Sequence, residues 1–183
     1  MTHLLITTSR KPNQRTRSFA KDLASVLPDA FKINRGKKTL LELGLECFRH
    51  RSNYLFIIGE RKGNPSIIRI YRLDKKAEYP LLKQILVFKI SSVKLSREIH
   101  SSRIYGIDYM WINYDKCLTD NCFHIADLFI DIYRDRISKE NYSIMLYLEE
   151  EDGVVFFKIY SRLGKICGPL FKINGVKKLD REV

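Results

Sequence analysis

Apolar and polar positions alternate along the chain with two periods, which predict a sheet covered by helices. Apolar runs typical of strands occupy 4–8, 53–59 and 65–73, and a further short strand precedes Asn34. Apolar residues at helical spacing occupy 14–27 and 39–51. The first half therefore reads as strand, helix, strand, helix, strand, strand, which is an α/β layer.

The second half repeats this mixture of periods. Strands are predicted at 84–90, 107–114, 142–149, 154–162 and 166–173, with a short helix at 91–100 and a long one at 120–137. Residues 74–83 are polar and contain Pro80, so we expect a linker there. The predicted fold is α/β, with mixed sheets and covering helices in one domain, 1–183, whose halves are 1–73 and 84–183.

Positive charge is concentrated at the start of the chain. Residues 1–38 hold nine Lys or Arg against two Asp, a net charge of +7 out of +12 for the protein. Such concentration is typical of a protein that binds polyphosphate. Residues 107–152 are the opposite, with four bases against eleven acids.

The first helix and its flanking loops carry the candidate binding site. Pro12 predicts that the helix begins just after it, with Asn13 as the N-cap. The free N–H groups and dipole of such a helix end favour an anion, and basic side chains flank it. A solvated charged face is the plain alternative. The predicted RNA-binding residues are Ser9, Arg10, Lys11, Asn13, Gln14, Arg15, Arg17, Ser18, Lys21, Arg35, Lys37 and Lys38.

Several motifs resemble those of the Brix-domain family. The N-terminal signature is matched by Thr7-Thr8-Ser9-Arg10-Lys11-Pro12 with Arg15 to Leu23, and Asn34-Arg35-Gly36-Lys37 resembles the next motif. Arg61-Lys62-Gly63-Asn64-Pro65 is similar to the central GxP segment, and Gly168-Pro169-Leu170-Phe171-Lys172-Ile173 to the C-terminal GPxFxI motif. After the GxP strand, residues 71–76 depart from the usual glycine- and proline-rich turn.

This resemblance, which covers nearly the whole chain, implies both a fold and a role. The family fold has two similar halves, each like the anticodon-binding domain of class IIa aminoacyl-tRNA synthetases. Its members are ribosome-assembly factors that bind ribosomal RNA or its precursors, and this chain is similar to the archaeal single-domain type. The expected partners are ribosomal RNA or pre-rRNA, together with ribosome-assembly proteins. We expect a cytoplasmic monomer without a signal peptide or membrane span.

Catalytic and metal-binding signals are weak. The sequence lacks GxxxxGK[ST], GxGxxG, HExxH and GxSxG, so we predict neither an enzyme nor a cofactor. Cys117, Cys122 and His124 are crowded but do not have the spacing of a zinc site. Buried thiols are the default interpretation for the four cysteines, and a disulfide stays open for a hyperthermophilic source.

Two other functions compete with RNA binding. Asp108, Asp115 and Asp120 are candidate magnesium ligands of an RNA nuclease. The predicted helix 120–137 carries an acidic face that either docks a basic protein or is merely solvated; its members are Asp120, His124, Asp127, Asp131 and Asp135.

Overall fold

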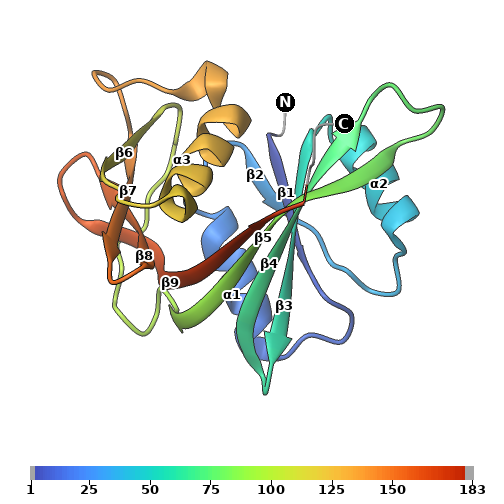
Figure 1. Ribbon diagram of the computed structural model, residues 1–183, viewed down its shortest axis with the longest axis horizontal. Coiled ribbons are helices and arrows are strands. Elements are labelled where there is room, and N and C mark those ends of the chain that lie inside the picture. Colours follow the sequence, from blue (N-terminus) through green and yellow to red (C-terminus); the bar gives the residue numbers. More distant parts are fainter. Residues whose placement is uncertain (1–2, 180–183) are drawn as a thin grey trace.

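Nine strands form one sheet in the computed structural model, which describes residues 3–179 (Figure 1). The sheet order is β2-β1-β3-β4-β5-β9-β8-β7-β6. The strands are β1 (Leu4–Thr8), β2 (Ala30–Lys32), β3 (Tyr54–Arg61), β4 (Asn64–Asp74), β5 (Leu81–Lys94), β6 (Met110–Lys116), β7 (Ile144–Glu151), β8 (Val154–Ser161) and β9 (Ile166–Lys178). The helices are α1 (Gln14–Ala24), α2 (Leu40–Arg49) and α3 (Asp120–Ile132), and a 3-10 turn, Arg134–Arg136, follows α3.

Helices cover both faces of the first half of the sheet. Alternate residues of a strand point to opposite faces, so Leu4 and Ile6 join the core under α1 and α3, whereas Leu5 joins the smaller core under α2. β1 is consequently buried along its whole length. This burial explains why β1 reads as a continuous apolar run rather than an alternating one.

The predicted starts of the helices at 14–27 and 39–51 agree with the structure to within one residue. Asn13 caps α1, because its side-chain oxygen accepts from the Arg15 N–H at 3.4 Å. Thr39 caps α2 in a reciprocal capping box with Glu42. α1 ends at Ala24, three residues before the predicted end.

The predicted short helix at 91–100 is wrong. β5 continues to Lys94, since Val93 and Lys94 pair with Phe171 and Leu170 of β9, and turns follow from Ser96 to His100. Pairing between β5 and β9 joins segments about 80 residues apart in the sequence, so a local pattern could not reveal it.

The predicted linker 74–83 contains the end of β4, the start of β5 and the turn between them. β4 and β5 are hydrogen-bonded neighbours, and Asp74 pairs with Leu81. The sheet therefore runs continuously through this region, with β5 at its centre and β9, red in Figure 1, beside it.

Two of the cysteines are not free thiols. Cys117 and Cys122 form a disulfide that joins the end of β6 to α3, whereas Cys47 and Cys167 are buried free thiols. The default interpretation of four buried thiols is thus corrected for the first pair.

Candidate nucleic-acid interface

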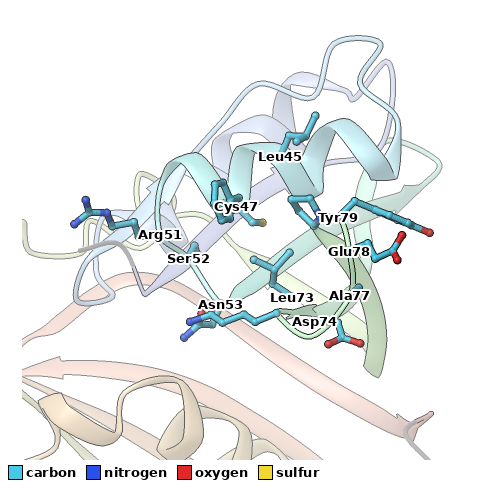
Figure 2. A pocket seen from close by; sticks show the side chains of 13 residues that line it. Leu45, Cys47, Arg51, Ser52, Asn53, Leu73, Asp74, Ala77, Glu78 and Tyr79 are labelled. Carbon is cyan, nitrogen blue, oxygen red and sulfur yellow. The ribbon is translucent and has the colours of Figure 1, made fainter.

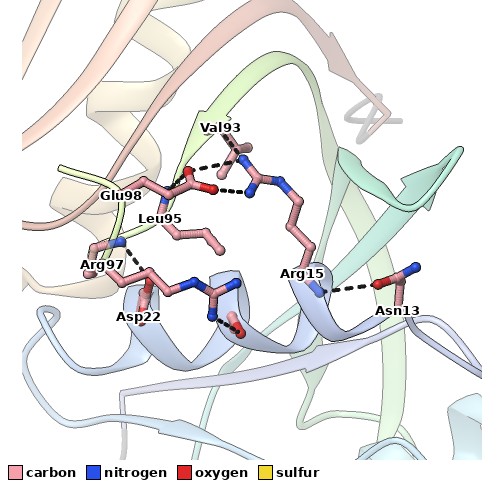
Figure 3. Close-up of polar contacts among 9 residues, drawn as sticks. Asn13, Arg15, Asp22, Val93, Leu95, Arg97 and Glu98 are labelled. Atoms are coloured by element: carbon pink, nitrogen blue, oxygen red, sulfur yellow. Dashed lines mark hydrogen bonds and ion pairs between the residues drawn. The ribbon is translucent and has the colours of Figure 1, made fainter.

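Arg15 anchors the segment after β5 to α1 (Figure 3). Its guanidinium forms an ion pair with Glu98 and donates to the Val93 carbonyl at 2.7 Å. Its hydrogen bond to Glu98 is the main reason that the pKa of that carboxyl lies below its usual range, and the Leu95 N–H lowers it further. Arg15 was predicted to bind RNA, but its charge is satisfied inside the protein.

Two further contacts hold the same segment against α1. The guanidinium of Arg97 donates to the Ser18 hydroxyl at 3.3 Å, and the Ser96 N–H donates to the Asp22 carboxylate at 2.9 Å. Arg15, Ser18 and Asp22 lie three and four residues apart, so they form one line along the helix. This line holds the second half of the chain against the first.

The neighbouring line of α1 faces a groove. Gln14, Arg17 and Lys21 border a hollow of about 1030 Å³ between α1 and residues 96–105, together with Ser18 and Ser25. Five cationic side chains border this groove: Arg17, Lys21, Lys32, Arg97 and Arg103. Of these, Arg17, Lys21, Arg97 and Arg103 are exposed.

The carboxylate that borders the groove already accepts a hydrogen bond within the protein. Among the described residues that line it, Asp22 supplies the carboxylate, and that carboxylate accepts the Ser96 N–H. Hydroxyl groups from Ser25, Ser101 and Ser102 add further hydrogen-bonding capacity. The groove thus combines excess positive charge with neutral polar groups, as an anionic chain requires.

The N-terminus of α1 is occupied by a carboxylate of the protein itself. Glu60, at the end of β3, accepts from the Asn13 N–H at 3.0 Å and from the Thr16 hydroxyl. This end of α1 was predicted to favour an external anion, and the structure places an internal one there.

The remaining predicted cations gather around two loops beyond β1 and β2. Arg10 donates to the Lys37 carbonyl at 3.3 Å, and Arg35 donates to the Lys38 carbonyl at 2.9 Å. Burial, followed by the nearby charge of Arg10, lowers the pKa of Arg35. We call Ser9, Arg10, Lys11, Arg35, Lys37 and Lys38 the loop cluster. Hydrogen bonds from Thr39 lower the pKa of the Glu42 carboxyl in α2, and the nearby positive charges of Lys38 and Arg10 lower it further. The loop cluster therefore borders α2, whereas the groove lies along α1.

Sequence reasoning missed the far wall of the groove. Arg97, His100 and Arg103 line it, and none of them was among the predicted RNA-binding residues. A signal existed, because Lys94, Arg97, His100 and Arg103 recur at every third position. On its own, that spacing does not show where the segment lies in the fold. The contacts with β9 and α1 place it beside the first basic stretch.

A second hollow, of about 600 Å³, lies between α2 and the turn after β4 (Figure 2). Leu45, Phe48 and Tyr79 line it with apolar surface, and Phe48 is 68% exposed. Arg51 and Lys75 are balanced there by Asp74 and Glu78. This balance does not suit a polyphosphate.

The acidic face of α3 is partly used inside the molecule. α3 ends at Ile132, five residues before the predicted end, so the predicted acidic face is divided. The Tyr54 hydroxyl donates to Asp131 of α3 at 2.5 Å, and His3 pairs at 2.8 Å with Asp135, which lies in the 3-10 turn after α3. Asp120 and Asp127 are exposed. Among residues 3–179, no group of three or more His, Cys, Asp or Glu is arranged to hold a metal ion.

The motifs that suggested a family converge on α1. Gly63, in the turn between β3 and β4, lies against Asn13, and the Phe171 ring of β9 packs edge-on against Phe19 at 5.1 Å. Gly168 contacts Val26 so closely that a Cβ there would lie 2.7 Å from the valine methyl groups. These motifs therefore fix the position of α1 and, through it, one wall of the groove.

Comparisons with known proteins agree with these motifs, although no family model matches the chain. A probable Brix domain-containing ribosomal biogenesis protein of Methanococcus maripaludis is 32% identical over 183 residues, covering 98% of this chain and 100% of that protein. A protein of the same name from Aeropyrum pernix is 42% identical over 93 residues, and the match spans half of that relative.

Solved structures share the fold. A probable ribosomal biogenesis protein from Aeropyrum pernix K1 has a TM-score of 0.81 at 28% identity, covering 100% of this chain and 99% of that one. An archaeal Imp4-like protein has a TM-score of 0.66 at 19% identity, covering 96% and 99%, which shows the fold alone. The full-length match to the Methanococcus protein shows the family, and the chain belongs to the archaeal Brix domain-containing ribosomal biogenesis proteins.

Proposed function

We propose that this protein is a ribosome-biogenesis factor that binds ribosomal RNA or its precursor and assists pre-rRNA processing and subunit assembly. The observation that carries the proposal is the groove, in which cations from α1 and from residues 96–105 face the same hollow. The names of its relatives supply the biological setting, ribosomal biogenesis.

The binding surface in this proposal has two parts. The groove supplies Gln14, Arg17, Ser18 and Lys21, and the loop cluster supplies a second set of cations beyond β1. Arg15 and Asn13 act within the protein, by holding residues 93–98 and by capping α1. Phosphate contacts of this kind give affinity without base sequence specificity.

We also infer that the chain is built from two related halves that resemble the anticodon-binding domain of class IIa aminoacyl-tRNA synthetases. The support is the strand order. β1 runs parallel to β3, and β3, β4 and β5 follow antiparallel; likewise β6 runs parallel to β7, and β7, β8 and β9 follow antiparallel. β5 and β9 join the two sets in the middle of the sheet.

Assembly proteins and a cytoplasmic location belong to the same proposal, as does the monomeric state. Within residues 3–179, the helices are too short or too polar to cross a bilayer.

The experiment compares two double charge reversals with the same change in net charge. Arg17→Glu with Lys21→Glu alters the groove, whereas Lys116→Glu with Lys139→Glu alters two exposed lysines in the acidic segment. Binding of labelled ribosomal RNA fragments is measured by fluorescence anisotropy over a range of salt concentrations.

We expect the groove variant to lose at least tenfold in affinity at low salt and to reduce the slope of log K against log salt by about 1 to 2, because two phosphate contacts are lost. The control variant should bind like the wild type. Equal binding by both variants and the wild type contradicts the site, and no binding of ribosomal RNA by the wild type contradicts the function.

A further inference from the structure

An exposed aromatic ring stands at the groove. Tyr105 is 81% exposed and belongs to the residues that line the hollow. Gly106 follows it with a φ of +63°, a backbone conformation that glycine adopts readily. A large ring in water gains nothing from packing, and it is available to stack on a flat partner.

The segment that carries Tyr105 is anchored upstream of the ring. The Ser102 N–H donates to the Ile166 carbonyl of β9 at 2.9 Å, and Leu95 is fully buried. The Ser96 and Arg97 contacts described above tie the start of the segment to α1. Tyr105 is therefore held near the groove by a tethered segment and not by a free loop.

Cations stand on both sides of the hollow that the ring borders. Arg17 and Lys21 project from α1, and Arg97 and Arg103 come from the segment opposite. A sugar–phosphate chain lying between them would meet positive charge on both sides, and a base turned away from that chain would meet Tyr105.

An RNA duplex cannot use such an arrangement fully. Its bases are paired and stacked inside the helix, so it offers only its phosphates and 2′-hydroxyls to the protein. An unpaired nucleotide can offer its phosphate to the arginines and its base to the ring at once, and base–aromatic stacking is the usual device for binding single strands.

We propose that the groove binds unpaired RNA nucleotides, with a base stacked on Tyr105 and the flanking phosphates held by Arg17, Lys21 and Arg103. This proposal rests on the proposed function. It adds the class of RNA that is bound and the residue on which a base stacks. It predicts a preference for single-stranded segments, such as loops and unfolded stretches of ribosomal RNA, over duplex of the same length.

The experiment measures binding of a single-stranded RNA decamer and of the same sequence in a blunt duplex. The variants are Tyr105→Ala, Tyr105→Phe, which keeps the ring, and Tyr79→Ala, which removes a half-exposed tyrosine from the other hollow. A 2-aminopurine placed in the decamer reports stacking, because its fluorescence is quenched when it stacks on a ring.

We expect the wild type to bind the single strand more tightly than the duplex and to quench the 2-aminopurine. Tyr105→Ala should weaken single-strand binding by about tenfold and abolish the quenching, whereas Tyr105→Phe and Tyr79→Ala should behave like the wild type. Duplex binding should be the same for all four proteins.

The outcomes separate this proposal from the broader one. If Arg17→Glu with Lys21→Glu weakens binding while Tyr105→Ala leaves single-strand affinity and quenching unchanged, the stacking proposal is overturned and RNA binding stands. Equal affinity for single strand and duplex also overturns it. Failure of the wild type to bind any RNA overturns both.

Discussion

Arg15 and Arg17 are two residues apart on α1 and have different roles. Arg15 points toward residues 93–98, where Glu98 and the Val93 carbonyl satisfy its guanidinium. Arg17 faces the groove and stays exposed. The sequence shows two similar basic residues near a helix start, and only the position of the second half of the chain separates a structural arginine from a candidate binding arginine.

The Arg15–Glu98 pair predicts a pH-dependent contribution to stability. Because Arg15 depresses the pKa of Glu98, the contribution is present above the pKa of about 4.3 for an unfolded Glu and is lost as pH falls through the lower pKa of the folded state. We expect Glu98→Gln to lower the free energy of unfolding by about 1 kcal/mol at pH 7 and by less at pH 3, measured by urea denaturation.

Arg15→Ala provides the matching control for this pair. It should remove most of the pH dependence of the Glu98→Gln effect, since the ion pair is absent at both pH values. A Glu98→Gln effect that is equal at pH 7 and pH 3 in the wild-type background would show that the ion pair contributes nothing measurable.

At the scale of elements, α1 is the meeting point of segments far apart in the sequence. The turn after β3, the 95–98 segment and the start of β9 all contact it. Gly168 allows one of these approaches, because its φ of +64° and its missing side chain let β9 pack against Val26, just after α1.

Gly168→Ala should therefore destabilise the protein through a steric clash as well as backbone strain. Gly164→Ala is the matched control, since Gly164 also has a positive φ, +80°, but has open space around it. We expect both variants to lose about 1 kcal/mol from backbone strain and Gly168→Ala to lose a further 1–3 kcal/mol from overpacking, measured by thermal and urea unfolding.

Val26→Ala separates the cost of backbone strain from the cost of the steric clash. If the clash is real, the double variant Gly168→Ala with Val26→Ala should be more stable than the sum of the single effects predicts, because the clashing methyl groups are gone. Additive effects would place the cost of Gly168→Ala in the backbone alone.

At the scale of the whole molecule, charge is distributed unevenly over a continuous sheet. Cations line the groove beside α1, whereas residues 107–152, which include β6, α3 and β7, have four bases against eleven acids. Such a distribution favours approach of a polyanion from the α1 side and disfavours the α3 side.

Lysine acetylation in the presence and absence of RNA tests this orientation. Bound RNA should protect Lys21 and Lys32 in the groove, whereas Lys116 and Lys139 should react equally in both conditions. Mass spectrometry gives the extent of modification at each lysine. Protection of Lys116 and Lys139 without protection of Lys21 would place the RNA on the acidic segment 107–152 and not in the groove.

Much of the fold was predictable because local patterns record burial. The strand at 4–8, the N-cap at Asn13 and the basic helix that follows agree with the structure. The helix predicted at 91–100 was wrong because β9 pairs with that segment, and the disulfide between Cys117 and Cys122 depends on how β6 meets α3.

The sequence by itself determined most of the strands and the starts of α1, α2 and α3, the concentration of positive charge in α1 and its loops, and the motifs that indicate the family. Only the tertiary structure decided that Glu60 accepts hydrogen bonds from Asn13 and Thr16 at the start of α1, that Arg15 is paired, and that Arg97, Arg103 and Tyr105 line the same groove as Arg17 and Lys21. The physical reason is range. Periodicity and capping are set by residues a few positions apart, whereas the groove exists because α1 and the start of β9 hold a distant segment, residues 96–105, beside α1 through hydrogen bonds to Ser18, Asp22 and Ile166.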